Sequence, residues 1–247
     1  MKKTICAVVA ARMTSSRMPG KSMALLAGKP SLSHIIARLR RSSLLDGVVI
    51  ATTENPSDDP IRECAIREGV DVFSGSEEDV LDRTLKAARS VSADIIVQVT
   101  GDCPLIDAAV VDPVISTYLK MKPDYICNRM PETYPNGMDT EVFSTELLAE
   151  VAMLTNDPND REHVSLYIYE HPEHYKLMNI AAPPEHHWPE LRLTLDTFED
   201  YGLIRSIYDG LYTANPVFGL SETLQWLRAN LYLLDINKGI RQKSARE

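Results

Sequence analysis

The chain has 247 residues, of which 44% are apolar and 25% are charged, and its formal net charge is −9. This composition and length predict one large globular domain over residues 1–247, and because the longest apolar runs fall far short of the ~20 residues of a membrane span, we expect a cytoplasmic protein without a membrane partner. The acidic balance excludes nucleic acid as a partner, so any anion that binds here is expected to be a small phosphorylated ligand held by a few local cations.

Apolar, β-branched runs alternate with helical patterns through the first half of the chain. The strand-like runs are residues 4–10, 47–53, 70–73, 94–99 and 124–127. Apolar residues recur at helical spacing over 32–39 and 80–88, Asp59-Pro60 is typical of a helix start, and Asp107 precedes a predicted helix over 108–121. Because each run is apolar on both sides, this alternation predicts an α/β fold with a mostly parallel sheet and helices on both faces.

The second half lacks this regular alternation. Residues 128–142 are rich in Pro, Asn, Gly and charged side chains, and we interpret them as a lid or interface insertion. Further on, residues 160–163 are predicted to open an apolar helix over 164–169, and a strand-like run at 191–195 precedes another helix start. The basic end, 238–247, is predicted to be a flexible, solvated tail.

Polar, turn-rich segments follow the first four predicted strands. These segments are residues 11–21, 52–54, 74–79 and 100–104. Because ligands of an open parallel sheet bind beyond the carboxyl ends of its strands, we expect the four segments to converge on one rim and form one site.

The first of these segments carries three cations, Arg12, Arg17 and Lys21, within a stretch short enough to wrap a triphosphate. Arginine forks match phosphate oxygens in pairs, while lysine acts as a point charge. The loop is not a Walker sequence, since the spacing G-x-x-x-x-G-K-[ST] is absent. The alternative is a solvated basic loop, but Pro19-Gly20 stiffens the turn before Lys21 and favours the phosphate site.

Two carboxylates are candidates for a magnesium site. Asp102 follows a β-branched strand in a Gly-Asp-x-Pro turn, and Asp196 follows the strand-like run at 191–195. Mg²⁺ takes one or two protein carboxylates beside substrate phosphates, which fits this pair, although Asp196 could equally be a plain helix N-cap. Arg161 and His163 would place positive groups at a positive helix end, which is unfavourable unless a substrate anion binds there.

Other reaction classes lack their sequence signatures. The six histidines are not spaced as a zinc site, no G-x-S-x-G elbow supports covalent catalysis, and no G-x-G-x-x-G follows the first strand. The four cysteines are widely spaced and are expected to be reduced and buried. Direct displacement on phosphorus is the reaction class that remains.

Several of these segments match a known family. Ala11-Arg12-x-x-Ser15-Ser16-Arg17-Met18-Pro19-Gly20-Lys21 resembles the A-R-x-x-S-x-R-L-P-G-K signature of cytidylyltransferases that activate acidic sugars. The similarity continues through residues 75–83, 100–107, 134–142, 160–164 and 193–197, and covers about residues 4–237. This order resembles the SpsF-like branch of spore-coat polysaccharide biosynthesis, which is related to Kdo and acylneuraminate cytidylyltransferases.

The resemblance implies CTP as co-substrate, Mg²⁺ as cofactor, a Rossmann-like (GT-A-like) nucleotidyltransferase sheet, and a homodimer built through residues 128–142. It implies catalytic roles for Arg12, Lys21 and Asp102, and metal binding by Asp102 and Asp196. The implied nucleotide-binding residues are Ala10, Ala11, Arg12, Ser15, Arg17, Lys21, Thr52, Ser76 and Gly101, the backbone of Ala10 and Ala11 meeting the base. The implied acceptor-binding residues are Tyr134, Asp139, Glu141, Arg161 and His163.

The function that follows is transfer of CMP from CTP to an acidic sugar or related small acidic or phosphorylated acceptor, with release of pyrophosphate, in surface polysaccharide biosynthesis. Stretches 134–137 and 160–163 depart from the Kdo enzymes, which leaves the acceptor open. No side chain stands out as a general base, and Asp139 and His163 are the ones to test. The alternatives are a glycosyltransferase that uses a nucleotide sugar and a nucleotide-binding module without turnover.

Overall fold

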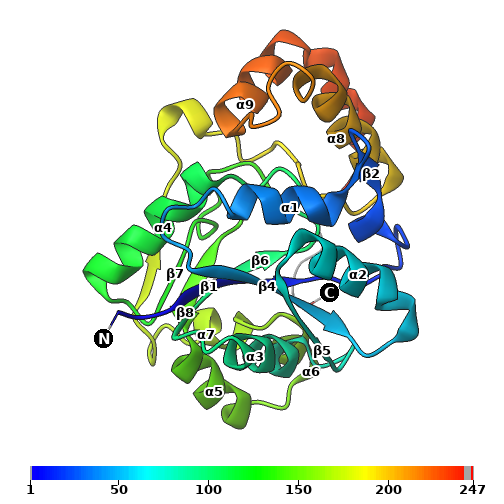
Figure 1. The fold of residues 1–247 in the computed structure, drawn as a ribbon. Coiled ribbons are helices and arrows are strands. Elements are labelled where there is room, and N and C mark those ends of the chain that lie inside the picture. The colour runs from blue at the N-terminus through cyan, green and yellow to red at the C-terminus, as the bar shows by residue number, and fades with distance from the viewer. Residues whose placement is uncertain (1, 242–245, 247) are drawn as a thin grey trace.

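A seven-stranded sheet forms the centre of the computed structural model, which describes residues 2–241 and 246 (Figure 1). The strand order is β5-β4-β1-β6-β8-β7-β9. The strands are β1 Ile5–Ala10, β4 Gly47–Thr53, β5 Asp71–Gly75, β6 Ile95–Thr100, β7 Tyr125–Cys127, β8 Glu141–Ser144 and β9 Leu177–Asn179. Strand β8 runs antiparallel to β6 and β7, and the other pairings are parallel. The prediction of a mostly parallel sheet is confirmed.

Helices cover both faces of this sheet, as predicted. In Figure 1, α1, α2 and α4 lie on one face, α3, α5, α6 and α7 lie on the other, and α8 and α9 form a further layer beyond α1. The helices are α1 Ser31–Leu39, α2 Asp59–Glu68, α3 Val80–Ser90, α4 Ala108–Met121, α5 Thr145–Leu154, α6 Pro158–Glu162, α7 Leu166–Glu170, α8 Phe198–Leu211 and α9 Leu220–Ala229. A short hairpin, β2 Leu25–Leu26 and β3 Lys29–Pro30, precedes α1. No helix within the described ranges is long and apolar enough to cross a membrane.

The alternation of side chains along β1 explains why the strand is apolar throughout. Ala7 and Val9 point into a core beneath α1, α2 and α4, whereas Cys6 and Val8 point into a second core beneath α3 and α5. A third core joins α8 and α9 to the extended segment 191–195. Val110 of α4 also belongs to this third core, which therefore packs α8 and α9 toward the start of α4.

The structure differs from the sequence predictions at three places in the following segments and strands. Segment 191–195 is extended but forms only one isolated bridge, between Arg192 and Asn136, and is not a strand of the sheet. Strand β8 begins inside the predicted insertion 128–142 and was not predicted, because so short a strand gives little periodicity. Helix α2 begins at Asp59 itself, so Asp59 is not its N-cap; the capping position is Asp58.

The helix predicted over 164–169 is present only from Leu166, as α7, and the placement of residues 160–163 in its first turn is wrong. Val164 has φ 56°, a left-handed conformation that breaks the helical path. Asp157 caps the short α6, which ends at Glu162, and a separate short α7 begins at Leu166.

The predicted insertion 128–142 packs mostly within its own chain, and Pro131 and Glu132 are its exposed residues. The amide of Asn136 donates to the carbonyl of Leu191 (2.9 Å), and the amide of Leu193 donates to the carbonyl of Asn136 (2.8 Å).

Of the predicted tail 238–247, residues 242–245 and 247 lie outside the described residues. Arg246 forms ion pairs with Asp157 and Glu170.

Gly137 tests how tightly this insertion is held. Gly137 has φ +102°, and a Cβ there would lie 2.8 Å from the carbonyl carbon and oxygen of Leu193. We expect Gly137→Ala to lower the free energy of unfolding by about 3 kcal/mol, since backbone strain and overpacking add. Gly28→Ala, where φ is +78° but nothing lies within 4 Å, is the control and should cost only about 1 kcal/mol. Equal losses in chemical denaturation of the two variants would contradict a clash at Gly137.

Candidate active site

The loops that follow β1, β4, β5 and β6 meet at one edge of the sheet, as the parallel pairing requires. The amide of Met13 donates to Asp58 (2.7 Å), and the hydroxyl of Thr14 donates to Glu77. The predicted convergence of these loops on one rim is therefore confirmed.

Asp58 organises the first loop, and the sequence analysis missed it. Its carboxylate is fully buried and accepts hydrogen bonds from the Met13 amide, the Thr52 hydroxyl (3.1 Å) and the Thr53 amide (3.1 Å). These bonds fix the start of the 11–20 loop to the end of β4. The sequence feature that points to Asp58 is the pair Asp58-Asp59, of which the sequence analysis uses only Asp59, as a helix start.

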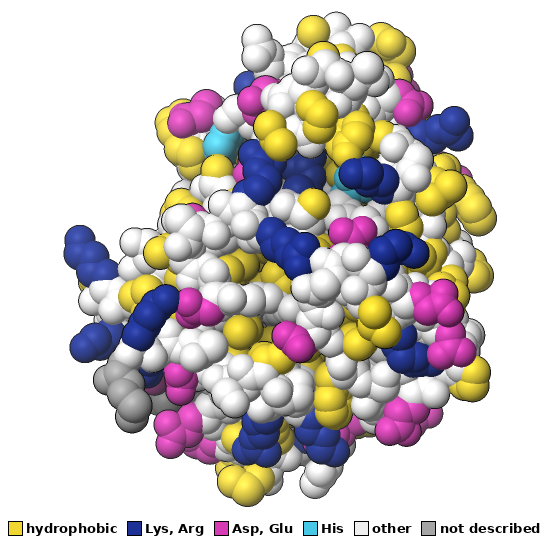
Figure 2. Space-filling model, in the orientation of Figure 1, with side chains coloured by type: hydrophobic (Ala, Val, Ile, Leu, Met, Phe, Trp, Pro, Cys, Tyr) yellow, Lys and Arg dark blue, Asp and Glu magenta, His cyan; other side chains and the backbone are white. Residues whose placement is uncertain are grey.

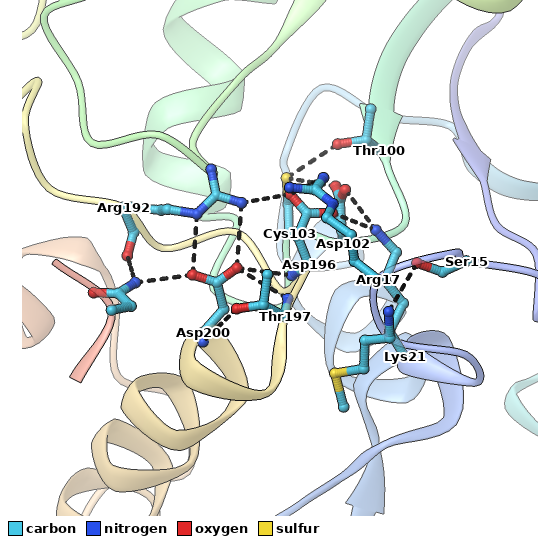
Figure 3. A network of polar contacts seen from close by, with 12 residues as sticks. Ser15, Arg17, Lys21, Thr100, Asp102, Cys103, Arg192, Asp196, Thr197 and Asp200 are labelled. Carbon is cyan, nitrogen blue, oxygen red and sulfur yellow. Dashed lines mark hydrogen bonds and ion pairs between the residues drawn. The ribbon is translucent and has the colours of Figure 1, made fainter. Parts of the chain in front are cut away.

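Lys21 joins the two predicted metal carboxylates, as Figure 3 shows. Its Nζ lies 2.9 Å from Oδ2 of Asp102 and 2.7 Å from Oδ1 of Asp196. The guanidinium of Arg17 lies 3.1 Å from Oδ2 of Asp196. Two of the three predicted phosphate-binding cations thus face the two predicted carboxylates.

Close backbone contacts bring these side chains together. The amide of Leu195 donates to the carbonyl of Asp102 (2.7 Å), which places Asp196 beside the end of β6. Gly101 lies so close to β1 that a Cβ there would be 2.6 Å from the carbonyl oxygen of Ala10. Gly20, with φ 76°, turns the chain into the short 3-10 helix Lys21–Met23 and so directs Lys21 to the rim.

A second ion-pair layer, not predicted from the sequence, supports Asp196. Arg192 donates to Asp196 (2.6 Å) and to Asp200 (3.0 Å), and Asp200 also accepts from the Asp196 amide (3.1 Å) (Figure 3). Thr197 is the N-cap of α8, with Asp200 completing a capping box, so Asp196 is not the plain N-cap that was the alternative. The sequence feature that points to this layer is Arg192, a charged residue within the apolar run 191–195.

The charges of Lys21 and Asp102 favour each other's ionised form. Burial alone would raise the pKa of Asp102, but the Lys21 charge and hydrogen bonds from Thr100 and Lys21 outweigh burial and lower that pKa well below its usual range. Burial alone would lower the pKa of Lys21, but the charges of Asp102 and Asp196 raise it. The Asp102 carboxylate and the Lys21 ammonium therefore coexist in charged form.

The donor set fits a hard divalent cation. Asp102 and Asp196 present carboxylate oxygens on either side of the Lys21 ammonium. The position between the two carboxylates therefore suits a positive charge. No group of three or more His, Cys, Asp or Glu side chains suited to a metal exists among the described residues. Two carboxylates nevertheless suffice for Mg²⁺ when phosphate oxygens and water complete its shell.

The other predicted nucleotide-binding residues lie around the same rim with different contacts. Arg12 lies 3.8 Å from Glu77 rather than facing the two carboxylates. The side chains of Ser15 and Ser76 accept hydrogen bonds from nearby amides (3.5 and 3.1 Å). The Ala11 amide donates to the carbonyl of Ala51 (3.2 Å), and the Ala10 carbonyl accepts from the Gly101 amide (2.9 Å).

The predicted acceptor-binding residues do not form one cluster. Arg161 donates to Asp79 and to the carbonyl of Ala152, so it ties the loop after β5 to α5 instead of offering a free cation. Glu141 is buried in β8 and accepts from Ser165. Tyr134 is buried in the third core, and His163 is half-buried at the end of α6.

Asp139 is the acceptor candidate with unusual chemistry. Burial, with help from the charges of Glu141, Glu132 and Asp102, raises the pKa of Asp139 to about 6, although Arg129 opposes the shift. The Asp139 carboxylate makes no hydrogen bond or ion pair with any residue in the described ranges. A carboxylate of this kind can accept a proton near neutral pH.

Comparisons with known proteins agree with this geometry. The family model described as cytidylyltransferase matches residues 6–225. The spore coat polysaccharide biosynthesis protein SpsF of Bacillus subtilis is 36% identical over 230 residues, which cover 90% of this chain and 93% of that protein. A 3-deoxy-manno-octulosonate cytidylyltransferase of Pelobacter propionicus is 39% identical over 122 residues, covering 47% of this chain and 44% of that protein.

A solved structure extends the likeness to the whole fold. A cytidylyltransferase from Leptospira borgpetersenii superposes with a TM-score of 0.89 at 31% identity, covering 98% of this chain and all of that chain. The family model spans most of the chain, including both the Lys21 loop and the segment that carries Asp196. The chain therefore belongs to the cytidylyltransferase family of nucleotidyltransferases.

Proposed function

We propose that this protein transfers CMP from CTP to a sugar acid or a related small acidic or phosphorylated acceptor and releases pyrophosphate. The observation that carries the proposal is the Lys21 bridge between Asp102 and Asp196, beside Arg17, at the carboxyl edge of the sheet. Basic side chains and carboxylates alternate there as a metal–triphosphate complex requires. The acceptor is proposed by analogy with the named relatives, which include an octulosonate cytidylyltransferase.

The chain's own residues bind and orient the reacting groups. Arg17 and Lys21 would turn from the carboxylates to the phosphates of CTP, and Arg12 would reach them from the other side of the loop. In-line attack by an acceptor oxygen on the α-phosphorus forms a new P–O bond while the bond to pyrophosphate breaks. Asp139, with its raised pKa, would take the proton of an attacking hydroxyl.

Mg²⁺ would be held by Asp102 and Asp196 and would supply charge neutralisation of the phosphates. The Arg192–Asp200 layer would keep Asp196 oriented for this role. A homodimer through residues 128–142 and a place in surface polysaccharide biosynthesis are part of the same proposal and rest on the family resemblance.

A glycosyltransferase is the weaker alternative. Its metal motif pairs two Asp residues one residue apart after a central strand, but here β6 is followed by Gly101-Asp102-Cys103-Pro104. The second carboxylate instead comes from the distant Asp196, and three cations on one loop exceed the needs of a diphosphate. A binding module without turnover predicts CTP binding and no pyrophosphate release.

Pyrophosphate release in the presence of Mg²⁺ tests the proposal, with the four nucleoside triphosphates and a panel of sugar acids and phosphorylated sugars. We expect CTP to be preferred and Lys21→Ala or Asp102→Asn to lower kcat/KM by about 100-fold or more, since each removes a charge at the transferred phosphate. Lys2→Ala is the matched control, because Lys2 pairs with Asp46 at the amino end of β1. Preference for ATP or UTP, or full activity of Lys21→Ala, would overturn the proposal.

Metal removal should separate activity from folding. We expect a chelator to abolish turnover and added Mg²⁺ to restore it, because a divalent cation would offset the negative charges of both the carboxylates and the triphosphate. The melting temperature of the nucleotide-free protein should stay unchanged, since Lys21, Arg17 and Arg192 already neutralise Asp102 and Asp196. Turnover that persists in chelator would rule out a metal role for the two carboxylates.

The pH profile tests Asp139 as the proton acceptor. Because the pKa of Asp139 is raised to about 6, the carboxyl is protonated and inactive as a base below that pH and active above it. We therefore expect kcat/KM to rise through pH 6 and Asp139→Asn to lower the rate and lose this acid limb. Glu132→Gln should move the limb to lower pH, since the Glu132 charge helps raise the pKa of Asp139. An unchanged limb in Asp139→Asn would assign it to another group.

A further inference from the structure

A cavity of about 690 Å³ lies between α1, the end of α2 and the α8–α9 connection, and its lining includes none of the residues of the candidate active site. Its walls carry four cationic side chains, Lys29, Arg38, Arg41 and Arg67, and one carboxylate, Glu68. In a chain with a formal net charge of −9, such a local excess of cations is unexpected unless an anion balances it. Figure 2 shows Lys and Arg side chains gathered on this face of the molecule.

Arg38, which lines the cavity, is only 6% exposed and has no carboxylate partner among the residues that the structure describes. Its Nε donates to the Tyr208 hydroxyl (3.3 Å), and its guanidinium carbon lies 4.5 Å from the centre of the Phe218 ring. Its Nη1 is buried and has no hydrogen-bond partner among the described residues. This nitrogen is closed to solvent, so it is the charge of the guanidinium, offset by no described carboxylate, that an anion in the cavity would balance.

The other three cations stand at the rim of the cavity. Lys29, Arg41 and Arg67 are exposed, and none of them forms an ion pair with another described residue. Their charges are therefore available to a ligand. His34 adds no charge, because burial and the neighbouring Arg38 and Lys29 lower its pKa and keep the ring neutral at pH 7.

The cavity also offers surface for the uncharged part of a ligand. The half-buried ring of Tyr212 lines it beside Pro216 and Val217. A volume of this size is typical of small-molecule sites, which combine apolar walls with a few polar groups that fix orientation. Arginine guanidinium groups and a lysine ammonium can together donate to several oxygens of one phosphate. A ligand with a phosphate group therefore fits these cations better than a ligand with a single carboxylate.

We propose that this cavity binds a small phosphate ester, with the phosphate between Arg38 and the rim cations and the organic body against Tyr212. The site is separate from the proposed CTP site. The body of the ligand could be a sugar or a nucleoside, and both would present the same phosphate to the cavity.

Calorimetric titration with glucose 1-phosphate and with CMP tests this proposal, with inorganic phosphate as the minimal probe. We expect saturable binding of at least one ester, which Lys29→Ala/Arg41→Ala/Arg67→Ala weakens by about 10-fold or more through loss of charged contacts. This triple variant changes only exposed side chains and should fold. Arg38→Gln is a second variant that should also lose binding. The better ester identifies the body of the ligand.

Two controls make the result decisive. Lys3→Ala/Arg89→Ala/Lys120→Ala removes the same charge from exposed positions outside the cavity and should bind like the native protein. Lys21→Ala should also retain the binding, which distinguishes this cavity from the CTP site. The proposal is overturned if no probe binds, if the control triple loses affinity equally, or if Lys21→Ala abolishes the signal.

Discussion

The ammonium of Lys21, held between the carboxylates of Asp102 and Asp196, is the interaction on which the site depends. Without it, two carboxylates would face each other with no ammonium between them, and like charges repel. With it, the pKa of Asp102 is lowered and that of Lys21 is raised, so these two partners stay charged. The same contact joins the first loop, the end of β6 and the segment before α8, which are three distant parts of the chain.

Backbone geometry makes this contact possible. Gly101 allows the end of β6 to approach β1 within a distance that no side chain would permit, and Gly137 allows the insertion to lie against Leu193. The carbonyl of Asp102 then accepts the Leu195 amide, which delivers Asp196. On the other side of the site, Asp58 fixes the start of the loop that carries Arg12, Arg17 and Lys21.

The sequence predicted the parallel core of the sheet and the rim, because β-branched runs and polar turns are local signals. It also predicted that Arg12, Arg17 and Lys21 would face Asp102 and Asp196. Arg17 and Lys21 do so, whereas Arg12 lies beside Glu77. The Asp58-Asp59 pair and the Arg in the apolar run 191–195 are visible in the sequence, but the roles of Asp58, Arg192 and Asp200 depend on contacts between distant segments and do not follow from it. The start of the helix predicted over 164–169 was misplaced for a related reason: Val164 adopts a left-handed conformation that a β-branched residue does not favour, so the helix begins at Leu166.

Lys21 and Asp196 are 175 positions apart, so the centre closes a very long loop. Emerging from the ribosome, the amino-terminal half can form the parallel strands but lacks the carboxylate that completes the cluster. Contacts between residues so far apart slow folding, because the entropy of closing the intervening chain is lost before the contact stabilises it. Synthesis of the segment that carries Asp196 is therefore the step at which a nascent chain first acquires the complete charge cluster.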